Sequence, residues 1–273
     1  MARTIASNFL YRIPMLVLLF WAFTVGVSLL WDFHPNIINL QQILATPNAH
    51  AWLGCDDLGR DVFARLINGA WVSMLVAVVV TIITLLFGTT IGLISGFYGG
   101  KVDRFIMHIT DVFMAFPGIL LAIAFAAVLG AGLGNLIIAL CMTSWVGYAR
   151  LTRAQSLSLR NRQHVIAAES LGANVPRMMF KHMLPLLAAP LVVEATYSIA
   201  GLIIAEASLS FLGLGIQAPN SSWGAMLRDG VRYMLVAPHY VLAVGLSLMS
   251  LVLAINLLGD QLRDYLDIKV DIK

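Results

Sequence analysis

Apolar runs of about 20 residues recur along this chain, and this repetition constrains the fold more than any other feature. An α-helix of that length crosses the hydrocarbon core of a bilayer. Only 11% of the 273 residues are charged, against about 25% in soluble domains, so a single soluble core does not fit. We therefore predict an all-α membrane protein with six transmembrane helices, at Ile13–Trp31, Ala70–Phe97, Phe105–Leu129, Leu133–Leu151, Leu184–Glu206 and Tyr240–Leu258.

The first apolar run follows two arginines, as a signal peptide would, but it is long for such a peptide. The stretch "LLWDFHP" after it offers no small-residue cleavage site, so we expect an uncleaved first span.

Basic residues are distributed unevenly between the two sides of this predicted topology. With the N-terminus inside, 13 of the 17 lysines and arginines fall on the inner side: Arg3, Arg12, Lys101, Arg104, Arg150, Arg153, Arg160, Arg162, Arg177, Lys181, Arg263, Lys269 and Lys273. The outer side holds Arg60, Arg65, Arg228 and Arg232. Because basic loops stay in the cytoplasm, both termini are predicted to be cytoplasmic. This asymmetry also explains the net charge of +3 without a nucleic-acid partner.

The inner loop at 152–183 is long for a simple connection and should have a purpose. Its apolar residues recur at helical spacing and predict one apolar face, formed by Ala168, Leu171, Val175, Met178 and Met179. Gly172 and Pro176 should divide it into two short helices that meet at a turn. The helices could lie on the membrane surface. The small residues Ala167, Ala168 and Gly172 instead favour close approach to a partner protein.

This loop carries a recognisable motif. "VIAAESLG" followed by "HMLP" resembles the EAA loop of permease subunits in binding-protein-dependent ABC importers, with Ala167, Ala168, Gly172, Leu184 and Pro185 at matching positions. Ile166 and His182 depart from the usual Glu and Ile. Four further stretches resemble the C-type permease of the dipeptide/oligopeptide/nickel subfamily: "LGCDDLGRDVFARL", "AFPGILLAIAFAAVLGAGLGN", "EASLSFLGLGIQAPNSSWGAML" and "NLLGDQLRDYLD".

The resemblance implies the type I permease fold of ABC importers, in a bacterial inner membrane. It implies a homologous second permease, two cytoplasmic ATPases and a periplasmic or lipid-anchored solute-binding protein as partners. The inner loop would hold a coupling helix seated on one ATPase, with Ala167, Ala168, Glu169, Gly172 and Pro176 as coupling residues. We divide the chain into residues 1–69 (tail, first span and periplasmic loop), the permease core at 70–258 and a cytoplasmic tail at 259–273.

Motifs for catalysis, cofactors or metals are not found in the sequence. "SGFYGGKV" lacks the first glycine and the hydroxyl residue of a P-loop, so ATP hydrolysis should belong to partner subunits and the chain should not be an enzyme. The six histidines are scattered without ligand spacing. Cys55 and Cys141 are expected to be free thiols. Asp56, Asp57 and Asp61 are expected to pair locally with Arg60 and Arg65 rather than to bind metal.

Several polar or small residues within the spans allow two interpretations each. Glu194, Ser198 and Gly201 share one helical face, which lines the translocation pathway or packs against another helix. Glu206 belongs to the outer gate or caps a local turn, and Asp57 with Arg60 is a candidate periplasmic contact.

Other residues are expected to shape the helices and their contacts. Arg104, His108 and Asp111 should form a paired polar stripe, and Pro117 should kink its span. Trp223 and Tyr233 suit an interfacial anchor. The repeated glycines could form a pore-lining helix pair or a packing contact within one subunit; they are Gly88, Gly92 and Gly96.

The resemblance favours a permease for dipeptides or oligopeptides. Uptake of nickel or a nickel chelate is the alternative within the same architecture. A non-transporting membrane assembly subunit is the alternative from another class, and a coupling-type loop argues against it.

Overall fold

The computed structural model describes residues 2–31 and 33–271, and within residues 2–11 and 267–271 only the backbone. The charge assignments at Arg3, Lys269 and Lys273 therefore lie outside the described side chains. All regular structure in the described residues is helical, apart from one isolated β-bridge between Cys55 and Asp61. The all-α prediction is confirmed.

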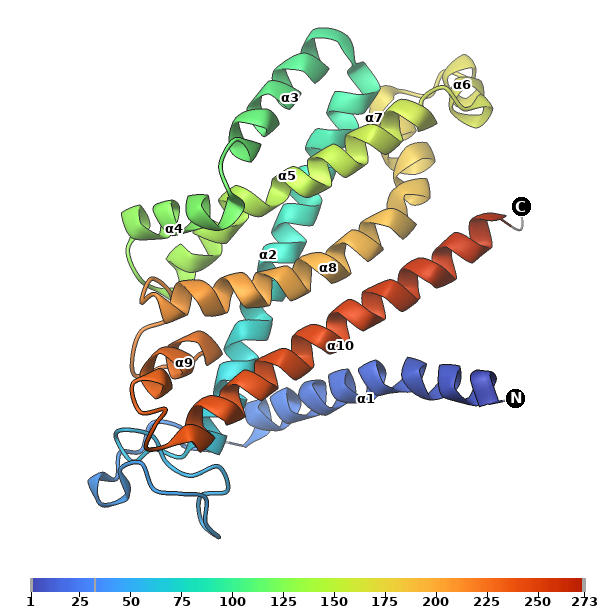
Figure 1. The fold of residues 1–273 in the computed structure, drawn as a ribbon. Coiled ribbons are helices and arrows are strands. Elements are labelled where there is room, and N and C mark those ends of the chain that lie inside the picture. Colours follow the sequence, from blue (N-terminus) through green and yellow to red (C-terminus); the bar gives the residue numbers. More distant parts are fainter. Residues whose placement is uncertain (1, 32, 272–273) are drawn as a thin grey trace.

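Short connections join most of the helices, whereas the long irregular segment 33–61 precedes α2 (Figure 1). In order they are α1 (Ala2–Leu30), the 3₁₀ turn η1 (Leu40–Gln42), α2 (Val62–Tyr98), α3 (Gly100–Met114), α4 (Gly118–Leu129), α5 (Leu133–Leu159), α6 (Gln163–Ser170), α7 (Val175–Arg177), the π-helical turn η2 (Met178–Met183), α8 (Leu184–Phe211), α9 (Trp223–Val231) and α10 (Pro238–Asp271).

Four helical segments of the described chain are long and apolar enough to cross a membrane: Arg12–Leu30, Val62–Tyr98, Val175–Phe211 and Pro238–Leu266. The pair α3 and α4 makes a fifth if it is taken as one bent span. The sixth predicted span, Leu133–Leu151, lies in α5, which does not reach the same hydropathy. Four or five spans are thus supported, and the sixth stays a prediction.

The kink expected at Pro117 is a break between two helices. The axes of α3 and α4 differ by 84°, so the kink predicted at Pro117 is confirmed, and it divides Phe105–Leu129 into two helices. Proline has no N–H for the preceding turn and disfavours helical backbone at the residue before it, here Phe116. The carbonyl of Pro117 then accepts hydrogen bonds from the N–H groups of Leu120 and Leu121, which starts α4 in a new direction.

The glycines of α2 allow it to pack closely on α5, and no other pair of helices shares so extensive a contact. A Cβ atom on Gly92 would lie 2.7 Å from the Thr152 Cβ, and one on Gly96 would lie 2.8 Å from the carbonyl oxygen of Arg153. A Cβ atom on Gly88 would likewise come too close to the backbone of α5. The three glycines therefore serve packing within one subunit, the second of the two interpretations given above.

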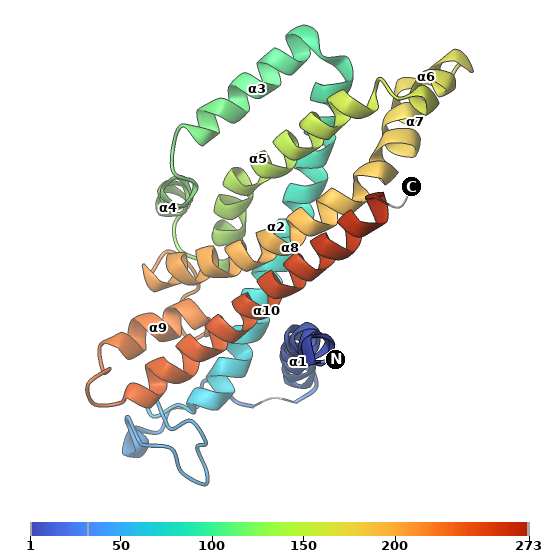
Figure 2. The same ribbon diagram turned by 45° about the vertical axis from the view of Figure 1, so that its right-hand side comes forward.

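The two ends of the helical bundle differ (Figures 1 and 2). The C-terminal end of α10 lies toward the end that carries α6 and α7, whereas the irregular segment 33–61 and α9 lie at the opposite end. The cytoplasmic location of both termini stays a prediction. The predicted tail at 259–273 continues α10 as far as Asp271.

Trp223 is a core residue, so the expectation of an interfacial anchor there is wrong. The side chain is 0% exposed and its indole N–H donates to the carbonyl oxygen of Leu66 at 2.9 Å. It also packs edge-to-face on Trp21, with ring centroids 5.0 Å apart. Hydropathy patterning cannot anticipate this role, because an indole suits a membrane surface and a protein core equally well. Trp223 thereby links α9 to α1 and α2.

Candidate functional site: the elbow at 163–183 and the open face of α8

The predicted division of the inner loop at Gly172 and Pro176 is confirmed. Helix α6 ends in a Schellman motif, in which Gly172 N–H bonds to the Glu169 carbonyl and Ala173 N–H bonds to the Ala168 carbonyl. Gly172 has φ of +80°, a conformation that favours glycine. Asn174 then caps α7, accepting a hydrogen bond from the Arg177 N–H at 3.1 Å. We call the segment from α6 through η2, Gln163–Met183, the elbow.

The elbow presents one set of side chains outward and another inward. Among the predicted coupling residues, Ala167, Glu169, Gly172 and Pro176 are exposed, whereas Ala168 is buried within the chain. Leu171 is 88% exposed, so the prediction of one continuous apolar face is wrong. The turn at Gly172 rotates the chain between the two helices, and helical spacing does not continue across it. Ile166 and Phe180 are also partly exposed and apolar.

The inward side of the elbow is anchored to the helical bundle. Met178, Met179 and Met183 are buried in one hydrophobic cluster that also includes residues of α2, α5 and α8, namely Leu93, Tyr148, Leu159, Leu187 and Leu191. The π-helical turn η2 leads directly into α8. A force applied to the exposed tip at Leu171 can therefore reach the spanning helices through packed side chains.

Ion pairs between α3 and α5 stabilise the same end of the bundle. Arg153 binds Asp103 through two guanidinium nitrogens, and Ser95 donates to the same carboxylate at 2.6 Å. Asp111 lies 3.9 Å from Arg150, so its partner belongs to α5 rather than to the predicted stripe on its own helix. Arg104, His108 and Asp111 do line one polar pocket of about 500 Å³, together with Gly100, Asp103, Met107 and Arg153.

The predicted pathway residues lie on a face of α8 that this chain leaves open. Glu194 and Ser198 are partly buried and Gly201 is exposed, with no atom within 4 Å of a Cβ built on it. The Glu194 carboxylate lies against Gly147 of α5, since a Cβ on that glycine would be 3.3 Å from its Oε1 atom. The buried Tyr148 hydroxyl faces Ser198 and Glu194 and makes no hydrogen bond of ordinary length. Sequence patterning did not reveal Gly147 or Tyr148, because they belong to another helix.

Glu206 is not on this open face. It is 0% exposed, and its carboxylate accepts hydrogen bonds from Ser73 of α2 at 2.6 Å and Ser210 of α8 at 2.7 Å. Ser222, the N-cap of α9, also interacts with it. The residue therefore joins three helices. This position favours a structural role over a gate that contacts substrate, and the three serines carried no motif that would have identified them.

The acids and bases before α2 pair locally, as predicted. Asp56 is fully buried and binds Arg60 at 2.7 Å and Arg65 at 3.3 Å, while Asp57 lies 3.7 Å from Arg60. Asp61 caps α2 instead, accepting from the Phe63 N–H. Burial, with the nearby carboxylates of Asp56 and Asp229, raises the pKa of Asp57.

Within the described residues, no group of three or more histidine, cysteine or acidic side chains could hold a metal ion. Cys55 and Cys141 are free thiols, as predicted.

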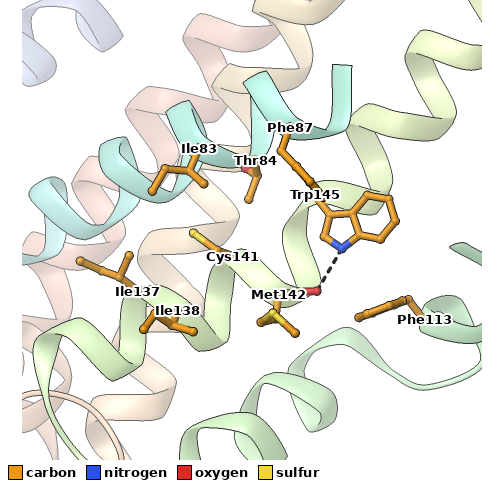
Figure 3. Close-up of a pocket in the computed structure, with 9 residues that line it drawn as sticks. All are labelled: Ile83, Thr84, Phe87, Phe113, Ile137, Ile138, Cys141, Met142 and Trp145. Atoms are coloured by element: carbon orange, nitrogen blue, oxygen red, sulfur yellow. Dashed lines mark hydrogen bonds between the residues drawn. The ribbon is translucent and has the colours of Figure 1, made fainter. Parts of the chain in front are cut away.

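A separate apolar groove of about 460 Å³ lies between α2, α3 and α5 (Figure 3). The lining is apolar except for Thr84 and the Trp145 indole, whose N–H donates to the Met142 carbonyl. The other lining residues are Ile83, Phe87, Phe113, Ile137, Ile138 and Cys141. None of the predicted pathway residues lines it. The groove has no charged group to recognise a polar solute.

Comparison with known proteins adds independent findings. A family model described as the inner membrane component of binding-protein-dependent transport systems matches residues 88–272. The glutathione transport system permease protein GsiD of Pectobacterium atrosepticum is 43% identical over 86% of this chain and 78% of its own length. The dipeptide transport system permease protein DppC of Alkalihalophilus pseudofirmus is 44% identical over 83% and 75%. The nickel transport system permease protein NikC of Escherichia coli K12 is 37% identical over 96% and 95%.

The fold also has a solved counterpart. A chain of the MetNI methionine ABC transporter, in an inward-facing conformation, matches with a TM-score of 0.60 over 74% of this chain and 96% of that chain, at 21% sequence identity. At this identity the likeness concerns the fold alone. The bundle described above is therefore the permease fold of an ABC transporter.

Proposed function

Because this chain belongs to the family of inner membrane components of binding-protein-dependent transport systems, we propose that it is the C-type permease of an importer for short peptides. It is a permease subunit of an ABC importer, and its role is transport rather than catalysis. Its proposed partners are a homologous second permease, two cytoplasmic ATPases and an extracytoplasmic solute-binding protein. The end that carries the elbow and the C-terminal end of α10 would face the cytoplasm, in agreement with the positive-inside rule.

The elbow is the observation that carries this proposal. Its tip at Leu171 is apolar and almost fully exposed, while its base is packed among the spanning helices. An apolar tip on a fixed base suits a groove on a partner, since large exposed apolar side chains mark protein contacts. Seated on an ATPase, it would transmit motion at the ATP sites into α8, whose open face holds Glu194, Ser198 and Gly201 as candidate pathway residues.

Two substrate classes fit the relatives. DppC and GsiD are named for a dipeptide and for glutathione, which is itself a small peptide, and they support peptide transport. NikC matches almost from end to end and supports nickel as the second candidate. The described part of this chain holds no cluster of metal-ligating side chains, which favours the peptide.

The substitution Gly172→Trp tests the coupling role. Within this chain a Cβ there meets no atom within 4 Å, so a large ring would clash only with a partner, while the φ of +80° strains any residue other than glycine. We expect peptide uptake to be lost and the ATPases to co-purify poorly, while the protein still inserts in the membrane. Gly172→Ala is the matched control, because alanine carries the backbone strain of a positive φ without adding a large ring.

If the elbow lay on the membrane surface, tryptophan would be tolerated there, because tryptophan favours membrane interfaces. Normal uptake and full ATPase retention in Gly172→Trp would therefore refute the coupling assignment.

A further inference from the structure

The acidic side chains within the helical bundle fall into two groups. Glu206 accepts hydrogen bonds from serines, Asp103 is bound by Arg153, and Asp111 lies near Arg150. Glu194 is different: within the described residues its carboxylate forms no hydrogen bond and no ion pair, although the Tyr148 hydroxyl faces it. A carboxylate in a membrane is costly unless it has a partner, so an unpaired one points to a function.

The position of Glu194 supports this distinction. It lies near the middle of the predicted span Leu184–Glu206, which forms most of α8. It is only partly buried, and the face it shares with Ser198 and Gly201 is not covered by this chain. Gly147 leaves space directly in front of the carboxylate, because a side chain there would approach its Oε1 atom.

A second polar group is directed to the same place. Tyr148 is fully buried, and its hydroxyl lacks a hydrogen bond although it faces Ser198 and Glu194. Buried hydroxyl groups are usually satisfied, so this one is a nearby donor for the Ser198 hydroxyl or the Glu194 carboxylate. The partly exposed carboxylate of Glu194 and the Ser198 hydroxyl thus lie on the same face of α8, and the buried Tyr148 hydroxyl of α5 faces them from within the chain.

We propose that Glu194, with Tyr148 and Ser198, forms a subsite in the translocation pathway that binds the ammonium group of the transported solute. This inference rests on the proposed function. A carboxylate supplies the negative charge, and the Ser198 hydroxyl oxygen is an acceptor for another N–H group of an ammonium. The buried Tyr148 hydroxyl would orient these two groups as a donor from behind. A divalent metal fits less well, since a single carboxylate is a poor ligand set and the described chain offers no cluster to complete it.

The test uses the complete importer, reconstituted in proteoliposomes with both permeases, both ATPases and the solute-binding protein. Uptake of radiolabelled dialanine and ATP hydrolysis are measured on the same preparation, for wild type and for Glu194→Gln. We expect the variant to hydrolyse ATP at a normal rate but to transport about tenfold less dialanine per ATP, as is typical when one member of a desolvated charge pair is lost. Glu194→Asp should restore part of the transport.

A second variant blocks the subsite without removing the charge. Gly147→Leu keeps Glu194 but places a side chain in front of its carboxylate, and it should lower dialanine uptake per ATP in the same way. Gly245→Leu is the control, because Gly245 also lies in a long apolar helix with no atom within 4 Å of a Cβ. That variant should transport like wild type.

Each other outcome has a defined meaning. If wild type transports dialanine and Glu194→Gln transports equally well per ATP, the subsite is refuted while the proposed function stands. If Glu194→Gln loses the second permease during purification, the carboxylate pairs with that subunit and the subsite is again refuted. If Ni²⁺ uptake falls tenfold and dialanine uptake does not, the site binds a metal instead of an ammonium group. If the wild-type complex transports neither solute, the proposed function itself fails.

Discussion

The contact between α2 and α5 is sensitive to a single methyl group, and Gly92→Ala tests it. A Cβ atom at this position would lie 2.7 Å from the Thr152 Cβ and closer still to the carbonyl oxygen of Ala149. Ordinary contact begins at 3.4 Å, so the helices would have to separate by at least 0.7 Å. The Ala149 carbonyl is part of the backbone and cannot rotate away as a flexible side chain would.

The magnitude follows from two opposing effects. Overpacking a well-packed contact costs about 1–3 kcal/mol, and the rigid neighbour places this case near 3 kcal/mol. Alanine is a better helix former than glycine by about 1 kcal/mol. We therefore expect the free energy of unfolding to fall by about 2 kcal/mol in Gly92→Ala.

Thermal unfolding of the full chain in detergent, followed by circular dichroism, measures this change. Gly245→Ala is the matched control: it adds the same methyl group where there is open space, and it should stabilise α10 slightly. Gly92→Ala should unfold at a lower temperature than wild type and Gly245→Ala at the same or a higher one. A Gly92→Ala protein as stable as the Gly245→Ala protein would refute the close contact.

Two further predictions concern the end of the bundle that holds the segment 33–61 and α9. Trp223→Phe should lower the free energy of unfolding by about 1 kcal/mol, because the hydrogen bond to the Leu66 carbonyl is lost, and a thermal melt would detect it. Burial raises the pKa of Asp57 above its ordinary 3.8, with help from Asp56 and Asp229, so the folded chain holds its proton more tightly than the unfolded chain. Stability should therefore decline as pH rises from about 3.8 through the raised pKa. Asp57→Asn should remove this decline and raise the melting temperature at pH 7. If the melting temperature of the variant depended on pH as that of the wild type does, this prediction would be contradicted.

Local signals in the sequence predicted local structure well. Gly172 and Pro176 break the inner loop where they should, because each imposes a backbone constraint that does not depend on the rest of the fold. Apolar length likewise identified the long spans. The break at Pro117 was placed correctly, but its 84° angle depends on how α3 and α4 pack, which residue types alone do not specify.

Contacts between distant segments could not be predicted from a single sequence. The same hydropathy pattern fits Glu194 and Glu206, yet one lies open and unpaired while the other is held by serines of three helices. Whether a carboxylate finds a hydrogen-bond donor depends on distant residues such as Ser73, which donates to Glu206. Leu171 was misassigned for a related reason, since the turn at Gly172 redirects the chain and interrupts helical spacing.

Uptake by the reconstituted importer tests the central claim most directly. Proteoliposomes containing the second permease, both ATPases and this chain are given the solute-binding protein outside, labelled dialanine outside and ATP inside. The account predicts accumulation of dialanine that requires ATP, the binding protein and this chain together, and its loss in Gly172→Trp. Equal accumulation from vesicles that lack this chain would contradict it.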